Sequence, residues 1–488
     1  MLDDAAPRGG ENPKFLVYPA SLLGGVMYEW RKLLSNRRLA FDAMSEQYKF
    51  LSERKEEHRS DYYRDSDRVL FSSAFRRMHD KTQVFPMPEN DHVHSRLTHS
   101  IEVASVGRSL GHTVGSILAE RDNAIRSKFP RFAADIGDVI HAACLAHDIG
   151  NPPFGHAGED AIAKYFVSFF ERNPLLASEL TRRQKSDLTK FEGNAQGFRL
   201  LTRLQNADTG GLQLTAATLA AFCKYPRESG DDIKICQHDN IAAKKHGCFQ
   251  EDKSALAMIA RHVGLNRIKL PKEVDADIVH ARHPLSFLVE AADNISYTIL
   301  DLEDGIRLKY VNKKEALELI RKIAKKANGF DPKKANDIVH LRGRAIQRLR
   351  TEVCEVFLDK ETFPEIMEGT YKKEIIKVIE SNTELEKIIE FTKQHCYQHQ
   401  FVVEMQVAGY NIIAGLLDEL IPAVIAHSNE RTHRQKMVLK ASGIVVRDSE
   451  TAYQKILKAT DYVAGMADSF ASALFRRLKG IELSSSIR

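Results

Sequence analysis

Apolar residues recur at three- and four-residue spacing along most of the chain, which is the period of an amphipathic helix. The pattern predicts helices over residues 157–170, 316–327 and 371–379. Alternating polar and apolar residues, the pattern of a half-buried strand, are scarce and indicate short strands only at residues 231–236 and 443–447. We therefore predict an all-α fold with at most a short β-hairpin.

The same pattern suggests how the chain is divided. Residues 1–26 are rich in Gly and Pro and interrupt the helical period, so we expect a flexible N-terminal extension there. Residues 27–488 form a single large helical domain in this interpretation. Its core lies at about residues 64–305 and holds the motifs described below, and a C-terminal helical part covers about 306–488.

Composition narrows the class of protein. The chain has 488 residues, 43% hydrophobic and 28% charged, which is ordinary for a soluble globular protein. The net charge of +5 is too small to imply a nucleic-acid protein by itself, although it suits a pocket that attracts phosphates. We expect no membrane span and no signal peptide, and six cysteines make no disulfide framework. These features predict a cytoplasmic protein.

His147 and Asp148 end an apolar run and are followed by Gly150, Pro152 and Pro153, which stop a helix and turn the chain. The turn brings His156 back towards the same place. Two imidazoles and a carboxylate around a forced turn suggest metal-assisted hydrolysis. The alternative is a capped core helix followed by a surface turn.

Other segments can complete such a site. His99 precedes the apolar helix 101–110, and Asp293 lies inside an apolar helix, where a carboxylate is costly to bury unless it is paired or binds a metal. Together with His147 and Asp148 these residues give a mixed nitrogen and oxygen ligand set. Such a set suits Mn²⁺, Fe²⁺, Co²⁺, Ni²⁺ or Zn²⁺.

His156 and Glu159 are three residues apart, so a helix that starts near His156 places them on one face. A carboxylate bonded to an imidazole fixes its tautomer and raises its basicity. This spacing makes His156 a candidate general acid or base that Glu159 orients. A surface pair is the alternative interpretation.

The order of these motifs resembles that of the HD-domain phosphohydrolases, and closely that of the deoxyguanosinetriphosphate triphosphohydrolase (dGTPase) family. The resemblance extends from about Trp30 to Gly465. The segments that carry it are residues 64–68, 75–77, 81–86, 96–100, 147–156, 191–197 and 290–297.

The resemblance implies an all-α fold and hydrolysis of dGTP, or of other dNTPs, to the deoxynucleoside and inorganic triphosphate by water attack at the α-phosphate. It implies a divalent metal, Mn²⁺ or Mg²⁺ first, and a homo-oligomer with a hexamer favoured. Single-stranded DNA or a nucleotide is the implied effector. The implied metal ligands are His99, His147, Asp148 and Asp293, and the implied catalytic pair is His156 and Glu159.

Substrate contacts follow from the same resemblance. Arg96 and Lys224 would contact phosphates, and Tyr225 completes the Lys-Tyr pair of the family. The sugar would meet Gln83, Tyr297 and Asp301, with the Tyr297 ring leaving no room for a 2′-hydroxyl. The base would meet Gln406.

Three questions stay open at this point. The enzyme could be specific for dGTP or use dNTPs broadly, and an HD-domain phosphohydrolase could instead cleave another nucleotide. A protein of a different class, which binds nucleic acid and has a regulatory metal site, is weakly suggested by basic stretches such as Lys244-Lys245. Finally, a second metal could bind two Cys/His pairs, each with a single residue between its members. The alternative is a plain loop that binds no metal. The residues of these pairs are Cys236, His238, His246 and Cys248.

Overall fold

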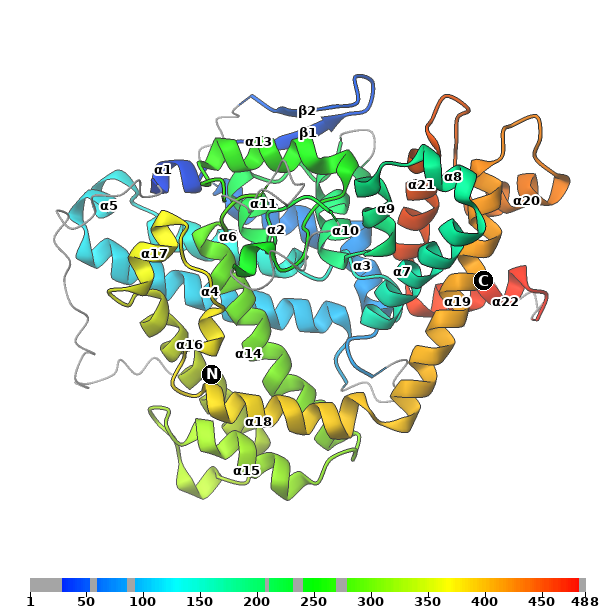
Figure 1. Cartoon of the computed structure of the whole chain (residues 1–488). Coiled ribbons are helices and arrows are strands. Elements are labelled where there is room, and N and C mark those ends of the chain that lie inside the picture. Colours follow the sequence, from blue (N-terminus) through cyan, green and yellow to red (C-terminus); the bar gives the residue numbers. More distant parts are fainter. Residues whose placement is uncertain are drawn as a thin grey trace.

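The computed structural model describes residues 29–52, 59–85, 93–206, 210–230, 240–268 and 279–481. Within these residues the chain is mainly helical with one two-stranded antiparallel hairpin, which confirms the predicted fold class (Figure 1). The predicted N-terminal extension, 1–26, lies outside the described residues.

The elements follow one another along the chain. They are α1 (Trp30–Leu33), β1 (Leu39–Asp42), β2 (Gln47–Phe50), α2 (Asp61–Leu70), α3 (Ser73–Arg77), α4 (Arg96–Arg121), α5 (Asn123–Lys128), α6 (Phe132–Ala146), α7 (Gly155–Arg172), α8 (Pro174–Glu179), α9 (Arg182–Thr189), α10 (Gly193–Arg199), α11 (Ala216–Phe222), α13 (Lys253–Val263), α14 (Pro284–Arg307), α15 (Lys313–Ala324), α16 (Ile338–Phe357), α17 (Thr362–Glu368), α18 (Asn382–Thr392), α19 (Gln400–Ile425), α20 (His433–Ser442), α21 (Ala452–Ala464) and α22 (Asp468–Leu478).

The hairpin is not where the sequence pattern places strands. β1 pairs with β2 from Leu39 opposite Phe50 to Asp42 opposite Gln47, and four-residue strands are too short to show a clear alternation. The predicted strand at 443–447 is wrong: it is a loop after α20, and Val445 is 73% exposed without a neighbouring strand. The predicted strand at 231–236 lies outside the described residues.

Of the predicted helices, 157–170 lies within α7 and 316–327 overlaps α15. The helix predicted over 371–379 is wrong, because only a single 3₁₀ turn, Ile375–Lys377, forms there. Its apolar residues Ile375, Ile376 and Ile379 are buried nonetheless. These residues are apolar because the loop packs into the core. Their spacing alone does not distinguish a buried loop from a helix.

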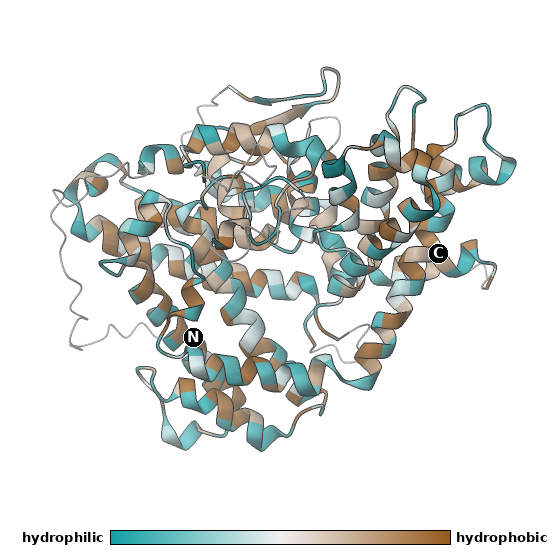
Figure 2. Ribbon diagram, viewed as in Figure 1, coloured by the Kyte–Doolittle hydropathy of each residue, from teal (hydrophilic) through white to brown (hydrophobic). Residues whose placement is uncertain are grey.

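The core consists of two hydrophobic clusters. The first joins α4, α6, α14 and α16, and the second joins α7, α19, α21 and α22. Each cluster draws on residues before and after position 305. Apolar residues line the sides of these helices that face one another, whereas polar residues cover the outer sides (Figure 2).

α4 and α6 pack closely because small residues lie between them. A Cβ added at Gly107 would lie 2.5 Å from Cys144 Sγ, and one at Gly115 would lie 2.6 Å from Ala133 Cα. A capping box, in which Ser95 and Thr98 bond each other's backbone, fixes the start of α4. The packing brings His99, near the start of α4, next to His147, which follows the end of α6.

α19 bears on the expectation that the chain has no membrane span. By length and composition this helix could cross a membrane, although 56% of its most apolar window is buried inside the protein. Leu416, Leu417, Leu420 and Ile421 of α19 belong to the second hydrophobic cluster. Packing against α7 and α21 therefore accounts for the apolar composition.

Candidate active site

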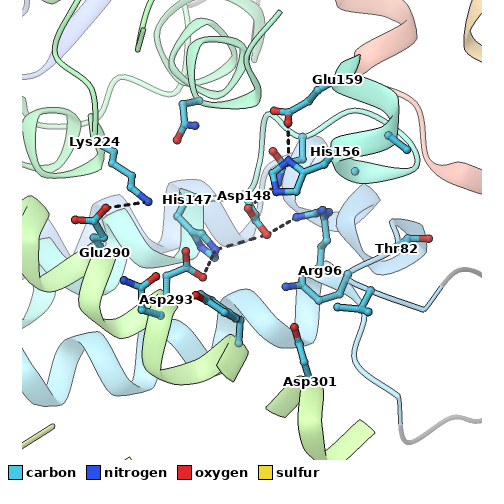
Figure 3. A pocket seen from close by; sticks show the side chains of 18 of the residues that line it. Thr82, Arg96, His147, Asp148, His156, Glu159, Lys224, Glu290, Asp293 and Asp301 are labelled. Carbon is cyan, nitrogen blue, oxygen red and sulfur yellow. Dashed lines mark hydrogen bonds and ion pairs between the residues drawn. The ribbon is translucent and has the colours of Figure 1, made fainter. Parts of the chain in front are cut away.

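One cavity of about 530 Å³ collects the predicted site residues from distant parts of the chain (Figure 3). Its walls come from α4, the turn between α6 and α7, α14 and α19. All the predicted residues except His99 line it: Gln83, Arg96, His147, Asp148, His156, Glu159, Lys224, Tyr225, Asp293, Tyr297, Asp301 and Gln406. His99 is 1% exposed and lies against Asp293.

Three side chains form a group with the chemistry of a metal site. Asp293 Oδ1 lies 3.2 Å from His99 Nε2 and 3.5 Å from His147 Nε2. The His147 Nδ1 atom is 2.7 Å from the Cys144 carbonyl oxygen, so Nδ1 donates there and Nε2 is the ring nitrogen that faces Asp293. Among the described residues, buried His147 Nε2 has no hydrogen-bond partner.

This orphaned nitrogen, a second imidazole and a carboxylate oxygen are donors that divalent transition metals prefer, so the residues fit a metal. Their ligand atoms all lie within 4.8 Å of one another, and in the described part of the chain no other such group of three occurs. Although burial opposes it, the negative charges of Asp148 and Asp293 raise the pKa of His147 to about 9. Metal binding would therefore displace a proton.

Asp148, the fourth predicted ligand, lies beside this group and is held by two donors. Arg96 Nη1 donates to its Oδ2 at 2.5 Å, and Asn151 Nδ2 donates to its Oδ1 at 2.6 Å. Its Oδ2 is 3.5 Å from His147 Nε2. Burial raises the pKa of Asp148, but the charges of Arg96, His147 and His99 together outweigh burial and lower it to about 2. Asp148 thus connects the metal group to the predicted phosphate contact.

His156 and Glu159 form the predicted pair at the start of α7. His156 Nδ1 lies 2.6 Å from Glu159 Oε2, and Glu159 Oε1 accepts the Gly193 N–H at 2.6 Å. The hydrogen bond with Glu159 raises the pKa of His156. The His156 side chain is 85% exposed and its Nε2 is left for a ligand. The buried carboxylate therefore orients an imidazole that can exchange a proton.

The turn between α6 and α7 packs against the start of α10. A Cβ at Gly150 would lie 2.0 Å from the Gly197 nitrogen, and one at Gly193 would lie 2.3 Å from Asn151 Oδ1. The motifs at 147–156 and 191–197, which are separate in the sequence, are therefore in direct contact in the structure. Without side chains at these glycines, α10 approaches closely enough for its first N–H to bond Glu159.

Lys224 lies across the cavity from His156. Its Nζ is 3.1 Å from Glu290 Oε1, and Arg282 donates to the other oxygen of Glu290 at 2.5 Å. Burial opposes the charge of Lys224, but Glu290, together with Tyr225 and Asp293, outweighs burial and raises the pKa of the lysine. Lys224 is thus a fixed positive charge, as a phosphate contact requires.

The remaining predicted contacts lie along α14 and α19. Asp301 accepts the Tyr397 hydroxyl at 2.7 Å, and burial raises the pKa of Asp301 to about 7. Among the described residues Gln83 Oε1 is buried without a partner, so it is available to a ligand. Tyr297 lines the same wall, and Gln406 lines the cavity from α19.

The sequence analysis missed several lining residues. Lys245, Asn194 and Tyr397 face the cavity, and Lys245 Nζ lies 2.5 Å from Glu192 Oε1. In the sequence, Lys245 appears only as part of the basic stretch Lys244-Lys245, which weakly suggests nucleic-acid binding. Asn194 and Glu192 belong to the motif at 191–197, which was the available signal for this part of the wall.

The second metal set is only partly described. Cys236 and His238 lie outside the described residues. His246 and Cys248 are fully buried, and burial lowers the pKa of His246 to about 3. In the part of the chain that the structure describes, these two residues are not members of a three-ligand group.

Comparisons relate the chain to known proteins. The HD domain family matches residues 96–190, which include three of the four predicted ligands and the catalytic pair. A "Deoxyguanosinetriphosphate triphosphohydrolase-like protein" of Synechocystis sp. is 40% identical over 93% of this chain and 100% of its own. One of Pseudomonas aeruginosa is 34% identical over 93% and 99%. A "Deoxyguanosinetriphosphate triphosphohydrolase" of Salmonella typhimurium is 27% identical over 86% and 93%.

Proposed function

This chain belongs to the family of deoxyguanosinetriphosphate triphosphohydrolase-like HD-domain proteins, and we propose that it hydrolyses dGTP to deoxyguanosine and inorganic triphosphate. The observation that carries the proposal is one cavity that joins the His99, His147 and Asp293 group to the His156–Glu159 pair. The proposal extends to other dNTPs as substrates.

The metal site supports the hydrolytic part of the proposal. His99, His147 and Asp293, with Asp148 beside them, would hold a divalent ion, Mn²⁺ or Mg²⁺ in the first instance. When bound, such an ion lowers the pKa of water and neutralises charge on a phosphate. Asp148 then has a second task, because its bond to Arg96 orients the guanidinium towards the cavity.

Positive side chains of the cavity suit a triphosphate. Arg96 lies beside the metal group, whereas Lys224 and Lys245 lie on other parts of the wall. Each lysine is paired with a buried carboxylate, Glu290 for Lys224 and Glu192 for Lys245, which holds its ammonium group in place. Preorganised charges of this kind stabilise the negative charge that develops on a phosphoryl group.

The leaving group explains the role of His156. Water attack at the α-phosphorus breaks the bond to O5′ of the sugar, and the departing oxygen takes up a proton. The hydrogen bond that His156 Nδ1 donates to Glu159 raises the pKa of His156, which favours the protonated imidazole that can donate a proton from Nε2. His156 is therefore the proposed general acid.

The sugar and base contacts are the finest part of the proposal. Tyr297 and Asp301 are four residues apart on α14, so both face the cavity from one side of the helix. The Tyr297 ring would exclude a 2′-hydroxyl and Asp301 would accept from the 3′-hydroxyl. Gln83 is proposed for the sugar and Gln406 for the base.

Product-resolved turnover tests the proposal. The protein is incubated with each of the four dNTPs and with GTP, in the presence of Mn²⁺ or Mg²⁺, and the products are separated. We expect deoxyguanosine and inorganic triphosphate from dGTP. Release of diphosphate or monophosphate would contradict the reaction type. The hexamer, the effector and the cytoplasmic location stay predictions.

A further inference from the structure

Phe154 lies between the catalytic pair and two C-terminal helices, and the proposed reaction does not use it. Its backbone has a φ of 63°, in the left-handed region that residues with a Cβ rarely adopt. It precedes the first residue of α7, two positions before His156, and its side chain is 6% exposed. A residue in this conformation persists only where its surroundings hold it there.

The first contact that holds Phe154 comes from Asp468 at the start of α22. Asp468 Oδ1 accepts the Phe154 N–H at 3.1 Å. Its Oδ2 accepts the Thr82 N–H at 3.0 Å and the Thr82 hydroxyl at 2.5 Å. Asp468 is 2% exposed, so water does not compete for these bonds. One buried carboxylate thereby ties the start of α7 to the residue that precedes Gln83.

The second contact comes from α19, which runs alongside α7 (Figure 1). A Cβ added at Gly409 would lie 2.8 Å from Phe154 Cγ and 3.0 Å from Phe154 Cβ, so the helix backbone rests directly on the ring. Met405 and Gln406, one turn earlier on α19, line the cavity. A shift of this wall therefore reaches the Phe154 ring.

The turn at Phe154 also adjoins the phosphate side of the cavity. The next residue, Gly155, has a φ of 57°, and a Cβ there would lie 2.7 Å from Arg96 Nη2. The Gly155 N–H donates to the Pro152 carbonyl oxygen at 3.2 Å, which closes the turn. Any movement of Phe154 would therefore move His156 relative to Arg96.

We infer that Phe154 is a positioning residue through which α19 and α22 set the place of His156. Asp468 fixes its backbone and Gly409 of α19 fixes its ring. The base-side wall and the general acid are then coupled, because both depend on the same side chain. This inference rests on the proposed function, since it assigns the purpose of the contacts to nucleotide hydrolysis.

Asp468→Asn tests the backbone contact. An amide in place of the carboxylate leaves one acceptor oxygen for the two sides that Asp468 now serves. We expect kcat for dGTP to fall about 10- to 100-fold, since small misplacements of reacting groups have effects of this size. KM and Mn²⁺ affinity should stay within about threefold, because no ligand contact is removed. An equal fall in Mn²⁺ affinity, or an unchanged kcat, would contradict the inference.

Asp448→Asn is the matched control. Exposed Asp448 accepts the Ser428 N–H at 3.0 Å and its hydroxyl at 2.5 Å, the same kinds of bond as Asp468 makes with Thr82. It lies outside the cavity lining. The control should keep wild-type kcat, and a loss equal to that of Asp468→Asn would mean that the effect is not specific to the contact with Phe154.

Gly409→Ala tests the contact of α19 with the Phe154 ring. This test remains possible if the Asp468→Asn variant does not fold. The added methyl would press on Phe154, and we expect kcat to fall about tenfold. Gly343→Ala in α16 is the control, because a Cβ there would have no atom within 4 Å. In a Phe154→Gly background, which removes the ring and tolerates the positive φ, Gly409→Ala should change kcat less than twofold. A tenfold fall in both backgrounds would overturn the inference.

Hydrogen exchange of the amides at 154–159 separates this inference from the proposed function. Exchange should be faster in Asp468→Asn and Gly409→Ala than in the two controls, with melting temperatures compared in parallel. If the wild type hydrolyses no dNTP, the proposed function fails, whereas the exchange rates still report whether these contacts hold α7. Unchanged exchange in both variants would overturn the inference even in an active enzyme.

Discussion

The two sides of the cavity are built differently. The metal group comes from residues in or next to α4, α6 and α14, which form the first hydrophobic cluster. The catalytic pair comes from α7, which belongs to the second cluster and meets the first across the turn at 147–156. Glycine-mediated packing of α4 against α6 places the proposed metal ligands, whereas the position of the proposed general acid depends in addition on a few polar bonds and one residue with a positive φ.

This difference predicts that metal binding and proton transfer by the proposed general acid are separable in this molecule. The ligands are positioned by close contacts between helix backbones, which leave little freedom. The position of His156 depends on Glu159 and on contacts that Phe154 makes with distant segments. Substitutions on one side should therefore leave the function of the other side measurable.

The largest expected effect is that of His147→Ala. Removing a ligand whose Nε2 faces Asp293 should abolish stoichiometric Mn²⁺ binding and lower kcat by about 10³-fold, because a bound metal contributes several kcal/mol to catalysis. Metal content and turnover are measured on the same preparation. His112→Ala, an exposed histidine of α4, is the control. Metal retained at wild-type affinity would contradict the assignment.

His156→Ala should lower kcat by about 10²- to 10³-fold while Mn²⁺ binding stays at the wild-type level. His156 bonds Glu159, which is not one of the predicted ligands. Isothermal titration with Mn²⁺ and single-turnover kinetics provide the two measurements. A joint loss of metal and activity would show that the two sides are not separable.

Glu159→Gln should shift the pH dependence of kcat. The hydrogen bond with Glu159 raises the pKa of His156 above its ordinary 6.5, so the acid form persists to higher pH and is lost as pH rises through the raised value. The variant should lose activity at lower pH than the wild type, and a shift of one unit gives about a tenfold loss above both pKa values. Profiles between pH 5 and 9 with Mg²⁺ test this. An unmoved basic limb would contradict the general-acid role.

The smallest expected effect concerns Tyr297, on the wall that α14 contributes. Tyr297→Ala should reduce the preference for dGTP over GTP, measured as the ratio of kcat/KM values, by about tenfold. Tyr297→Phe keeps the ring and should keep the preference. Loss of discrimination in the Phe variant as well would assign it to the hydroxyl rather than to the ring.

Much of the candidate site was predictable because the residues that suggest its chemistry occur in short sequence motifs. The helical period indicated the fold class, and an aspartate inside the apolar helix 290–297 indicated a paired or metal-bound carboxylate. His147 and Asp148 could be connected with His156 because Gly and Pro residues force the turn between them. In these cases the signal and its structural consequence lie within about one or two helical turns.

Other features escaped local reasoning. The helical spacing at 371–379 belongs to a buried loop, and the strand predicted at 443–447 has no partner strand. Burial and pairing are decided by what lies opposite a segment, and that neighbour comes from elsewhere in the chain. Lys245 was overlooked for the same reason, because its position in the cavity depends on Glu192.

The sequence by itself determined the helical class through its periodicity, and the resemblance of its ordered motifs indicated the family. It also predicted the ligand residues and the His156–Glu159 pair, because short spacings act within single helices and turns. Only the tertiary structure decided that Arg96 donates a hydrogen bond to Asp148 and that Lys224 pairs with Glu290. It alone decided that the Phe154 N–H donates to Asp468. Each of these pairs joins segments tens to hundreds of residues apart. Their contact follows from how the two hydrophobic clusters pack, which no local pattern specifies.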